Sequence, residues 1–334
     1  MKRLMVLLFA AIPAFAQVIV DTPRGVVVAR DGRVELPGVW NEEGVLNATE
    51  IVASNERVAV LDALRDRVVI VELADGRLAR YGTAATPIAA AFVGRDLYVL
   101  CRDARVVQKM GGPRIDAAAD PAFLAQANGK LYVYSRTTGV IEEIEGDRIT
   151  RRVTVAPFAS DFEVSGTTGY LAFPREARIR IVDLARMQAG EAIDAGAVPV
   201  DIALAGGGTA LTARILAVAD PSAKRIWLTE GKQSTGKAIA RGFLRGFLGL
   251  GLFGSRSSEF PTGVDRVVAR GGRWVAYDSS SGTLYRVDRR KSSVIAQGIA
   301  PKAFTLTDEG VAWWQNGRLN HLPERGTSVA PKKR

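Results

Sequence analysis

The chain has 334 residues, of which 47% are hydrophobic, 24% charged and 7% aromatic, a composition typical of a packed globular protein and not of a disordered or collagen-like one. Its single cysteine, Cys101, excludes an intramolecular disulfide and a thiolate zinc cluster, and its single histidine, His321, excludes a multi-histidine metal site. The formal net charge is +10, carried mostly by arginines spread along the chain, which is typical of a soluble surface.

The first sixteen residues have the pattern of a secretory signal peptide. Lys2 and Arg3 are positively charged, Leu4 to Ala11 form an uncharged apolar run, and Ala14-Phe15-Ala16 places small residues where a signal peptidase reads them. We therefore expect residues 1–16 to be removed and the bacterial protein to be periplasmic or secreted. The apolar run is too short to span a bilayer, so we expect no transmembrane helix in the mature chain. Export also argues against nucleic acid as a partner.

A short apolar strand recurs seven times along the rest of the chain, and a second apolar strand follows each copy after 8 to 11 residues. This near-constant offset predicts seven β-hairpins of similar size. The first strands begin at Val58, Leu97, Leu131, Tyr170, Ile215, Trp274 and Val311, and the second strands at Val68, Val106, Val140, Ile179, Ile226, Leu284 and Leu319.

A third strand rich in small residues precedes most hairpins, as in Pro87–Ala91, Pro199–Ala203 and Pro301–Phe304. Alanine suits innermost strands, which converge near a central axis. Polar turns such as Glu72–Arg77 then lead to a fourth, outer strand. Four strands in about 40 residues predict a propeller blade. We therefore expect an all-β, seven-bladed β-propeller over residues 17–323. The alternatives are six or eight blades, a two-domain β-sandwich or an open solenoid.

The last unit has room for only three strands before the chain ends. The N-terminal region carries strand sequences without a hairpin of the repeating kind, Gly25–Val28 and Arg33–Leu36. We predict that one of them completes the last blade and closes the ring, because a closed ring leaves no open sheet edge. The compact basic run near the C-terminus predicts a flexible tail over residues 324–334.

One insertion, at about residues 231–260, interrupts the repeat and is rich in glycine and phenylalanine. On a helix its apolar residues would share one face, which suits a membrane interface or a partner surface, and its arginines would lie on another. The alternatives are a loop folded over the propeller and disorder. The residues expected to make the contact are Arg241, Phe243, Arg245, Phe247, Leu250 and Phe253.

The insertion also contains Gly231–Ala238, which nearly matches a phosphate-binding P-loop. Ala238 stands where a serine or threonine hydroxyl must reach Mg²⁺, and the flanking strands do not form a parallel βαβ sheet. We therefore do not expect nucleotide binding.

Residues for catalysis are few. Asp201 and Asp265 begin repeat units, and both could face the channel, where they would hold a divalent ion such as Ca²⁺. The acidic run Glu142 to Asp147 is expected in a solvated outer turn. We expect Cys101 to be a buried small residue and His321 to be structural or exposed.

The repeats resemble the YVTN and NHL type of bacterial propeller. The resemblance rests on Gly94–Val99 and Gly129–Val133, each followed by a turn and a second strand. The asparagine that ends the family signature is replaced by Cys101 and Ser135, and the chain has no Trp-Asp pair, which argues against the WD40 type. The resemblance implies an extracytoplasmic scaffold, with lactonase-like enzymes among related propellers.

We therefore expect a monomeric, non-catalytic exported scaffold without a cofactor, which binds a protein partner or an anionic envelope surface. The alternative is a metal-dependent, lactonase-like hydrolase whose site lies at the channel, with Asp201 and Asp265 as the metal-holding carboxylates.

Overall fold

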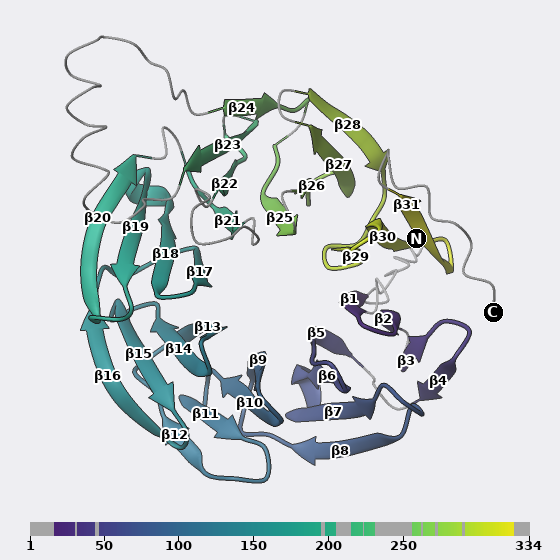
Figure 1. Ribbon diagram of the computed structural model, residues 1–334, viewed down its shortest axis with the longest axis horizontal. Coiled ribbons are helices and arrows are strands. Elements are labelled where there is room, and N and C mark those ends of the chain that lie inside the picture. Colours follow the sequence, from purple (N-terminus) through teal and green to yellow (C-terminus); the bar gives the residue numbers. More distant parts are fainter. Residues whose placement is uncertain are drawn as a thin grey trace, which may run out of the picture.

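The computed structural model describes residues 17–30, 32–43, 47–194, 198–204, 215–222, 224–230, 256–261, 263–270, 273–288 and 291–323. These residues form a ring of antiparallel sheets around a central axis (Figure 1). Seven sheets have four strands and one has three, and strands follow one another in chain order within each sheet, with the innermost first. We number the sheets as blades 1 to 8 in chain order.

The first four blades span residues 18–154. Blade 1 contains β1 (Val18–Thr22), β2 (Gly25–Arg30), β3 (Arg33–Leu36) and β4 (Trp40–Glu43), and blade 2 contains β5 (Ala48–Ala53), β6 (Arg57–Asp62), β7 (Arg67–Glu72) and β8 (Leu78–Gly82). Blade 3 contains β9 (Pro87–Val93), β10 (Asp96–Cys101), β11 (Val106–Lys109) and β12 (Arg114–Asp116), and blade 4 contains β13 (Pro121–Ala127), β14 (Lys130–Ser135), β15 (Val140–Glu145) and β16 (Arg148–Thr154).

The last four blades span residues 161–323. Blade 5 contains β17 (Asp161–Ser165), β18 (Thr168–Phe173), β19 (Arg178–Asp183) and β20 (Gln188–Asp194), and blade 6 contains β21 (Asp201–Leu204), β22 (Ile215–Asp220), β23 (Arg225–Glu230) and β24 (Arg256–Glu259). Blade 7 contains β25 (Arg266–Arg270), β26 (Arg273–Asp278), β27 (Thr283–Asp288) and β28 (Lys291–Ala296), and blade 8 contains β29 (Phe304–Leu306), β30 (Gly310–Gln315) and β31 (Arg318–Pro323).

The hydrophobic core lies between neighbouring blades, so both faces of each sheet are covered. One cluster joins Val27 of blade 1 to Val58 and Val69 of blade 2, and another joins Tyr134 of blade 4 to Phe162 of blade 5. Because alternate residues of a strand point to opposite faces, a strand covered on both faces is apolar at every position. This explains why Leu97–Cys101 is buried without interruption.

The all-β propeller and its seven hairpins are confirmed, since the predicted hairpins are the second and third strands of blades 2 to 8. An N-terminal strand does close the ring, but the prediction that it completes the last blade is wrong. The N-terminal strands pair with one another and form blade 1, which makes eight sheets among the described residues, seven of them four-stranded. The ring closes by packing, because β1 contacts β29 and the Ile19 N–H donates to the Lys302 carbonyl at 3.1 Å.

Within the acidic run, Glu145 and Asp147 are exposed at the turn as predicted, but the placement of Glu142 and Glu143 there is wrong. Glu142 and Glu143 lie within β15 and are fully buried. Antiparallel pairing sets them opposite Arg152 and Arg151 of β16. Carboxylates opposite cations on neighbouring strands stabilise each other, so these glutamates belong to the sheet and not to a turn.

Gly139 lies in the turn between β14 and β15 and packs closely against the link from blade 4 to blade 5. Its φ is +67°, and a Cβ there would lie 2.5 Å from the carbonyl carbon of Ala156. We expect Gly139→Ala to lower the free energy of unfolding by about 3 kcal/mol, because the left-handed conformation is strained for alanine and the backbone must also move.

The matched control is Gly129→Ala. Gly129 has a φ of +74°, but a Cβ there meets nothing within 4 Å, so only the conformational strain of about 1 kcal/mol applies. Urea denaturation of the two variants measures the difference. Equal destabilisation would show that the contact with Ala156 does not matter.

Candidate functional site

Two aspartates connect the inner strands of three consecutive blades. Asp161 and Asp201 are the first residues of β17 and β21. The Asp161 carboxylate accepts the N–H of Ile202 in β21 at 2.9 Å, and the Asp201 carboxylate accepts the N–H of Val267 in β25 at 2.7 Å. Each aspartate therefore reaches from its own inner strand to the next one around the ring.

A third carboxyl, Glu163, lies on the same face of β17 as Asp161, two residues along the strand. Burial and, to a smaller extent, the negative charge of Asp161 together raise the pKa of Glu163 to about 8. Burial also raises the pKa of Asp161 to about 6, although the N–H groups of Ile202 and Phe162 act in the opposite direction.

Burial and the charge of Asp161 together raise the pKa of Asp201 well above its ordinary value. Like charges held close together in a half-buried site cannot all ionise near neutral pH. We call Asp161, Glu163 and Asp201 the channel carboxyls. A raised pKa of about 8 keeps the Glu163 carboxyl protonated at neutral pH. Loss of this proton is therefore expected to weaken the packing of blades 5 to 7.

The two carboxylates predicted to hold a metal are not brought together in this cluster. Asp201 is one of the channel carboxyls, whereas Asp265 accepts hydrogen bonds from the N–H of Ser279 at 3.0 Å and from its hydroxyl. Across the described residues, no three side chains of His, Cys, Asp or Glu are arranged to hold a metal ion. Asp161 and Glu163 lie two residues apart in the chain, but their approach to Asp201 depends on blade packing and could not be predicted from the sequence.

The other residues noted in the sequence have these positions. Arg241, Phe243, Arg245, Phe247, Leu250 and Phe253 lie outside the described residues, between β23 and β24. Cys101 is fully buried, and burial raises the pKa of its thiol to about 11, so the thiol is protonated and buried as expected. His321 is exposed on β31, with Nε2 at 3.4 Å from the Thr307 hydroxyl.

One end of the ring carries an uneven share of the exposed apolar side chains. Because successive strands of a blade run in opposite directions, the chain leaves a four-stranded blade at the same end of the ring at which it entered. The links between blades and the turns after each second strand therefore lie at this one end. We call this end the loop face. Leu64, Phe158 and Val198 belong to it and are 77%, 48% and 37% exposed. They are half of the large hydrophobic residues that are exposed in the described part of the chain.

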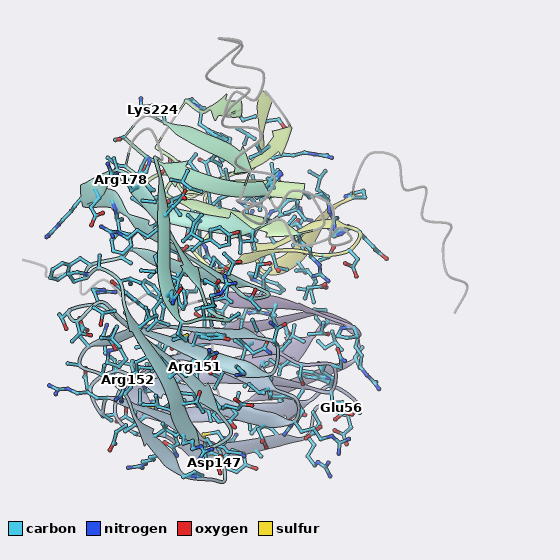
Figure 2. All side chains as sticks on the ribbon, turned by 60° about the vertical axis from the view of Figure 1, so that its left-hand side comes forward. Glu56, Asp147, Arg151, Arg152, Arg178 and Lys224 are labelled. Carbon is cyan, nitrogen blue, oxygen red and sulfur yellow. The ribbon has the colours of Figure 1, made fainter. Side chains whose placement is uncertain are left out.

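The loop face also carries exposed cations, Arg105, Arg136, Arg175, Arg178 and Lys224. None of these five forms an ion pair with any described residue. Figure 2 shows Arg178 and Lys224 along one side of the molecule and Glu56, which belongs to a turn at the other end of the ring, on the opposite side. This surface could not be predicted from the sequence, because its residues come from different repeats.

No family model matches the chain, and no curated protein matches it either. Solved structures do match. The dihydro-heme d1 dehydrogenase NirN, solved in complex with DHE, is 12% identical with a TM-score of 0.66, over 92% of this chain and 70% of that one. BamB from Moraxella catarrhalis is 11% identical with a TM-score of 0.62, over 90% of this chain and 94% of that one.

A chain of the Mitotic Checkpoint Complex is 10% identical with a TM-score of 0.59, over 97% of both chains. The chain is a β-propeller. These matches agree with the resemblance to YVTN and NHL repeats, and at such low identity they show the fold alone. No helix among the residues that the structure describes is long and apolar enough to cross a membrane.

Proposed function

We propose that this β-propeller is an exported, non-catalytic scaffold that binds a protein or an envelope surface in the periplasm or outside the cell. The observation that carries the proposal is the loop face, where exposed apolar side chains and cations without ion-pair partners in the described chain occur together. Apolar residues surrounded by polar ones, with arginine enriched, are typical of protein interaction surfaces.

Two further observations support the proposal. Residues 1–16 have the pattern of a signal peptide, which supports export of the mature chain from the cytoplasm. Among the similar solved structures, the chain from the Mitotic Checkpoint Complex belongs to a protein assembly, so the same fold serves in at least one complex. Fold similarity alone does not transfer a partner, and the partner of this propeller must be found by experiment.

The test is to express the full chain with a C-terminal tag in a bacterial host, fractionate the cells and cross-link them before purification. We expect a processed chain that begins at residue 17, recovered outside the cytoplasm and cross-linked to a reproducible partner. An unprocessed cytoplasmic chain would overturn export. A processed chain that never cross-links to protein or sediments with envelope would overturn the scaffold role.

The insertion supplies a second prediction. We propose that residues 231–255 add an envelope contact through Phe243 and Phe247, with Arg241 and Arg245 at anionic headgroups. The deletion must stop at residue 254, because β24 begins at Arg256 and pairs with β23.

We expect deletion of residues 232–254 to leave the thermal unfolding transition in place and to move most of the protein from the membrane to the soluble fraction. The matched control is replacement of residues 232–254 by a glycine-serine linker of equal length, which should behave like the deletion. Unchanged sedimentation with membranes in both variants would exclude this role for the insertion.

A further inference from the structure

Phe158, on the loop face, is an aromatic residue whose backbone is fixed by hydrogen bonds and whose side chain is half exposed. It lies in the link from blade 4 to blade 5 and is 48% exposed. Its φ is +67°, a left-handed conformation that bulky residues rarely adopt. Such a conformation persists only where the surroundings enforce it, and it often marks a functional position.

The surroundings of Phe158 do enforce it. The buried Tyr134 hydroxyl donates to the Ala156 carbonyl at 2.7 Å and accepts the Ala159 N–H at 3.0 Å, so one side chain fixes the backbone on both sides of Phe158. The Phe158 N–H itself donates to the Arg136 carbonyl at 2.8 Å. A residue whose backbone is already fixed loses less conformational entropy when a partner covers it.

One arginine stands beside this ring, because the Arg175 guanidinium of blade 5 lies 5.3 Å from the centroid of Phe158. The exposed Arg136 of blade 4 is joined to Phe158 through the backbone, and its guanidinium lies 6.0 Å from the centroid of another ring, Phe123. Neither arginine forms an ion pair among the described residues. The carboxylate next to Arg175 in the chain, Glu176, is paired with Arg180 at 2.7 Å.

The fold does not need an aromatic residue in this link. Blade 7 has the corresponding hydrogen bond from a buried tyrosine to its link, because the Tyr277 hydroxyl donates to the Ile299 carbonyl at 2.7 Å. The residues that follow Ile299 are Ala300, Pro301 and Lys302. The hydrogen bond from the buried tyrosine to the link therefore forms without an exposed ring nearby, and it does not explain why residue 158 is a phenylalanine.

We propose that Phe158, Arg136 and Arg175 form a docking site for an acidic protein segment, with an apolar side chain of the partner against Phe158 and its carboxylates at the two arginines. This rests on the proposed scaffold function and names the chemistry of its partner. Aromatic and arginine side chains dominate binding energy at protein interfaces, and arginine pairs with carboxylates in two-pronged geometry. A membrane fits less well, because interfacial binding needs a broad apolar face instead of one exposed ring.

The test uses fluorescence anisotropy with two pools of labelled peptides, added to the purified mature chain. One pool carries aspartate or glutamate on both sides of a central leucine or phenylalanine, and the other carries lysine at the acidic positions. We expect the acidic pool to bind and the lysine pool not to bind. Phe158→Ala should weaken binding about tenfold or more, and the double variant Arg136→Glu with Arg175→Glu should abolish it.

The controls are Tyr81→Ala, which removes an aromatic ring of similar exposure from β8, and Arg24→Glu, which reverses an exposed cation at the opposite end of the ring. Both should bind like the wild type. The chemical denaturation midpoint of every variant is measured first, and Phe158→Leu, which keeps an apolar side chain, provides a second test if Phe158→Ala fails to fold.

Each other outcome overturns the proposal. Failure of the acidic pool to bind, or equal binding by Phe158→Ala, rules out this site. Binding of anionic phosphatidylglycerol vesicles that is lost in Phe158→Ala, without peptide binding, would assign the site to lipid instead. If cross-linking still captures a partner that Phe158→Ala retains, the scaffold function stands and only the docking site fails.

Discussion

Replacement of Glu163 by glutamine is expected to make the protein more stable than the wild type at pH 8, by on the order of 2 kcal/mol. The pKa of Glu163 is raised to about 8, first by burial and then by the charge of Asp161. A folded-state pKa above the unfolded value means that the folded state holds the proton more tightly. This contribution is complete below the ordinary pKa of 4.5 and is lost as the pH rises through about 8. Glutamine has the same shape and never ionises.

Urea denaturation at pH 5, 7 and 8 measures this effect. The wild type should lose stability between pH 5 and pH 8, and Glu163→Gln should lose less. Glu309→Gln is the matched control, because Glu309 is exposed and forms no ion pair within the described chain. A variant whose stability falls with pH as steeply as that of the wild type would mean that Glu163 is ionised in the folded protein without cost.

The hairpins of the propeller could be predicted from the sequence because each depends on residues close together. In β10 and β11, an apolar strand, a polar turn and a second apolar strand span Asp96–Lys109, and that pattern repeats with a near-constant offset. Blade 1 was missed because its outer strand, Trp40–Glu43, reads Trp-Asn-Glu-Glu and carries little apolar signal. Trp40 instead packs against Gly76 of the next blade, a contact that the sequence does not reveal.

The candidate sites depend on contacts between repeats, which explains why the sequence revealed less of them. Asp161 and Asp201 are 40 residues apart in the chain and meet only because successive inner strands pack side by side. Asp265 begins its unit in the same way as Asp201, but it bonds to the turn of its own blade at Ser279. For Glu142 and Glu143 a signal was present, since Arg151 and Arg152 follow at hairpin distance and predict pairing across the two strands.

The Glu143 carboxylate is the centre of a polar cluster with many hydrogen bonds. It is fully buried and accepts hydrogen bonds from Arg151 on two nitrogens, from Lys130 at 3.2 Å and from Thr150 at 2.8 Å. Arg151, on the outer strand β16 (Figure 2), also donates to the carbonyls of Leu184 and Ala185 in blade 5. The cluster therefore fastens blade 4 to blade 5.

Glu143→Ala is expected to lower the free energy of unfolding by about 4 kcal/mol, because removal of one partner leaves the partly buried Arg151 without its carboxylate. The control is Glu145→Ala on the same strand, whose side chain is 58% exposed and pairs with Lys130. It should cost less than about 1 kcal/mol. Similar losses in both variants would contradict the role of burial. The variant Glu143→Gln, which keeps the volume, separates the charge from the packing.

The same carboxylate predicts how stability changes in acid, in the direction opposite to Glu163. Burial alone would raise the pKa of Glu143, but the hydrogen bonds from Arg151, Thr150 and Lys130 outweigh burial and lower it to about 2. A depressed pKa gives stability that is present above the unfolded value of 4.5 and is lost as the pH falls towards 2. Together with Glu163, this predicts maximal stability near pH 5. In Glu143→Gln the loss below pH 4.5 should become shallower, whereas the loss above pH 5 should remain, because Glu163 is unchanged.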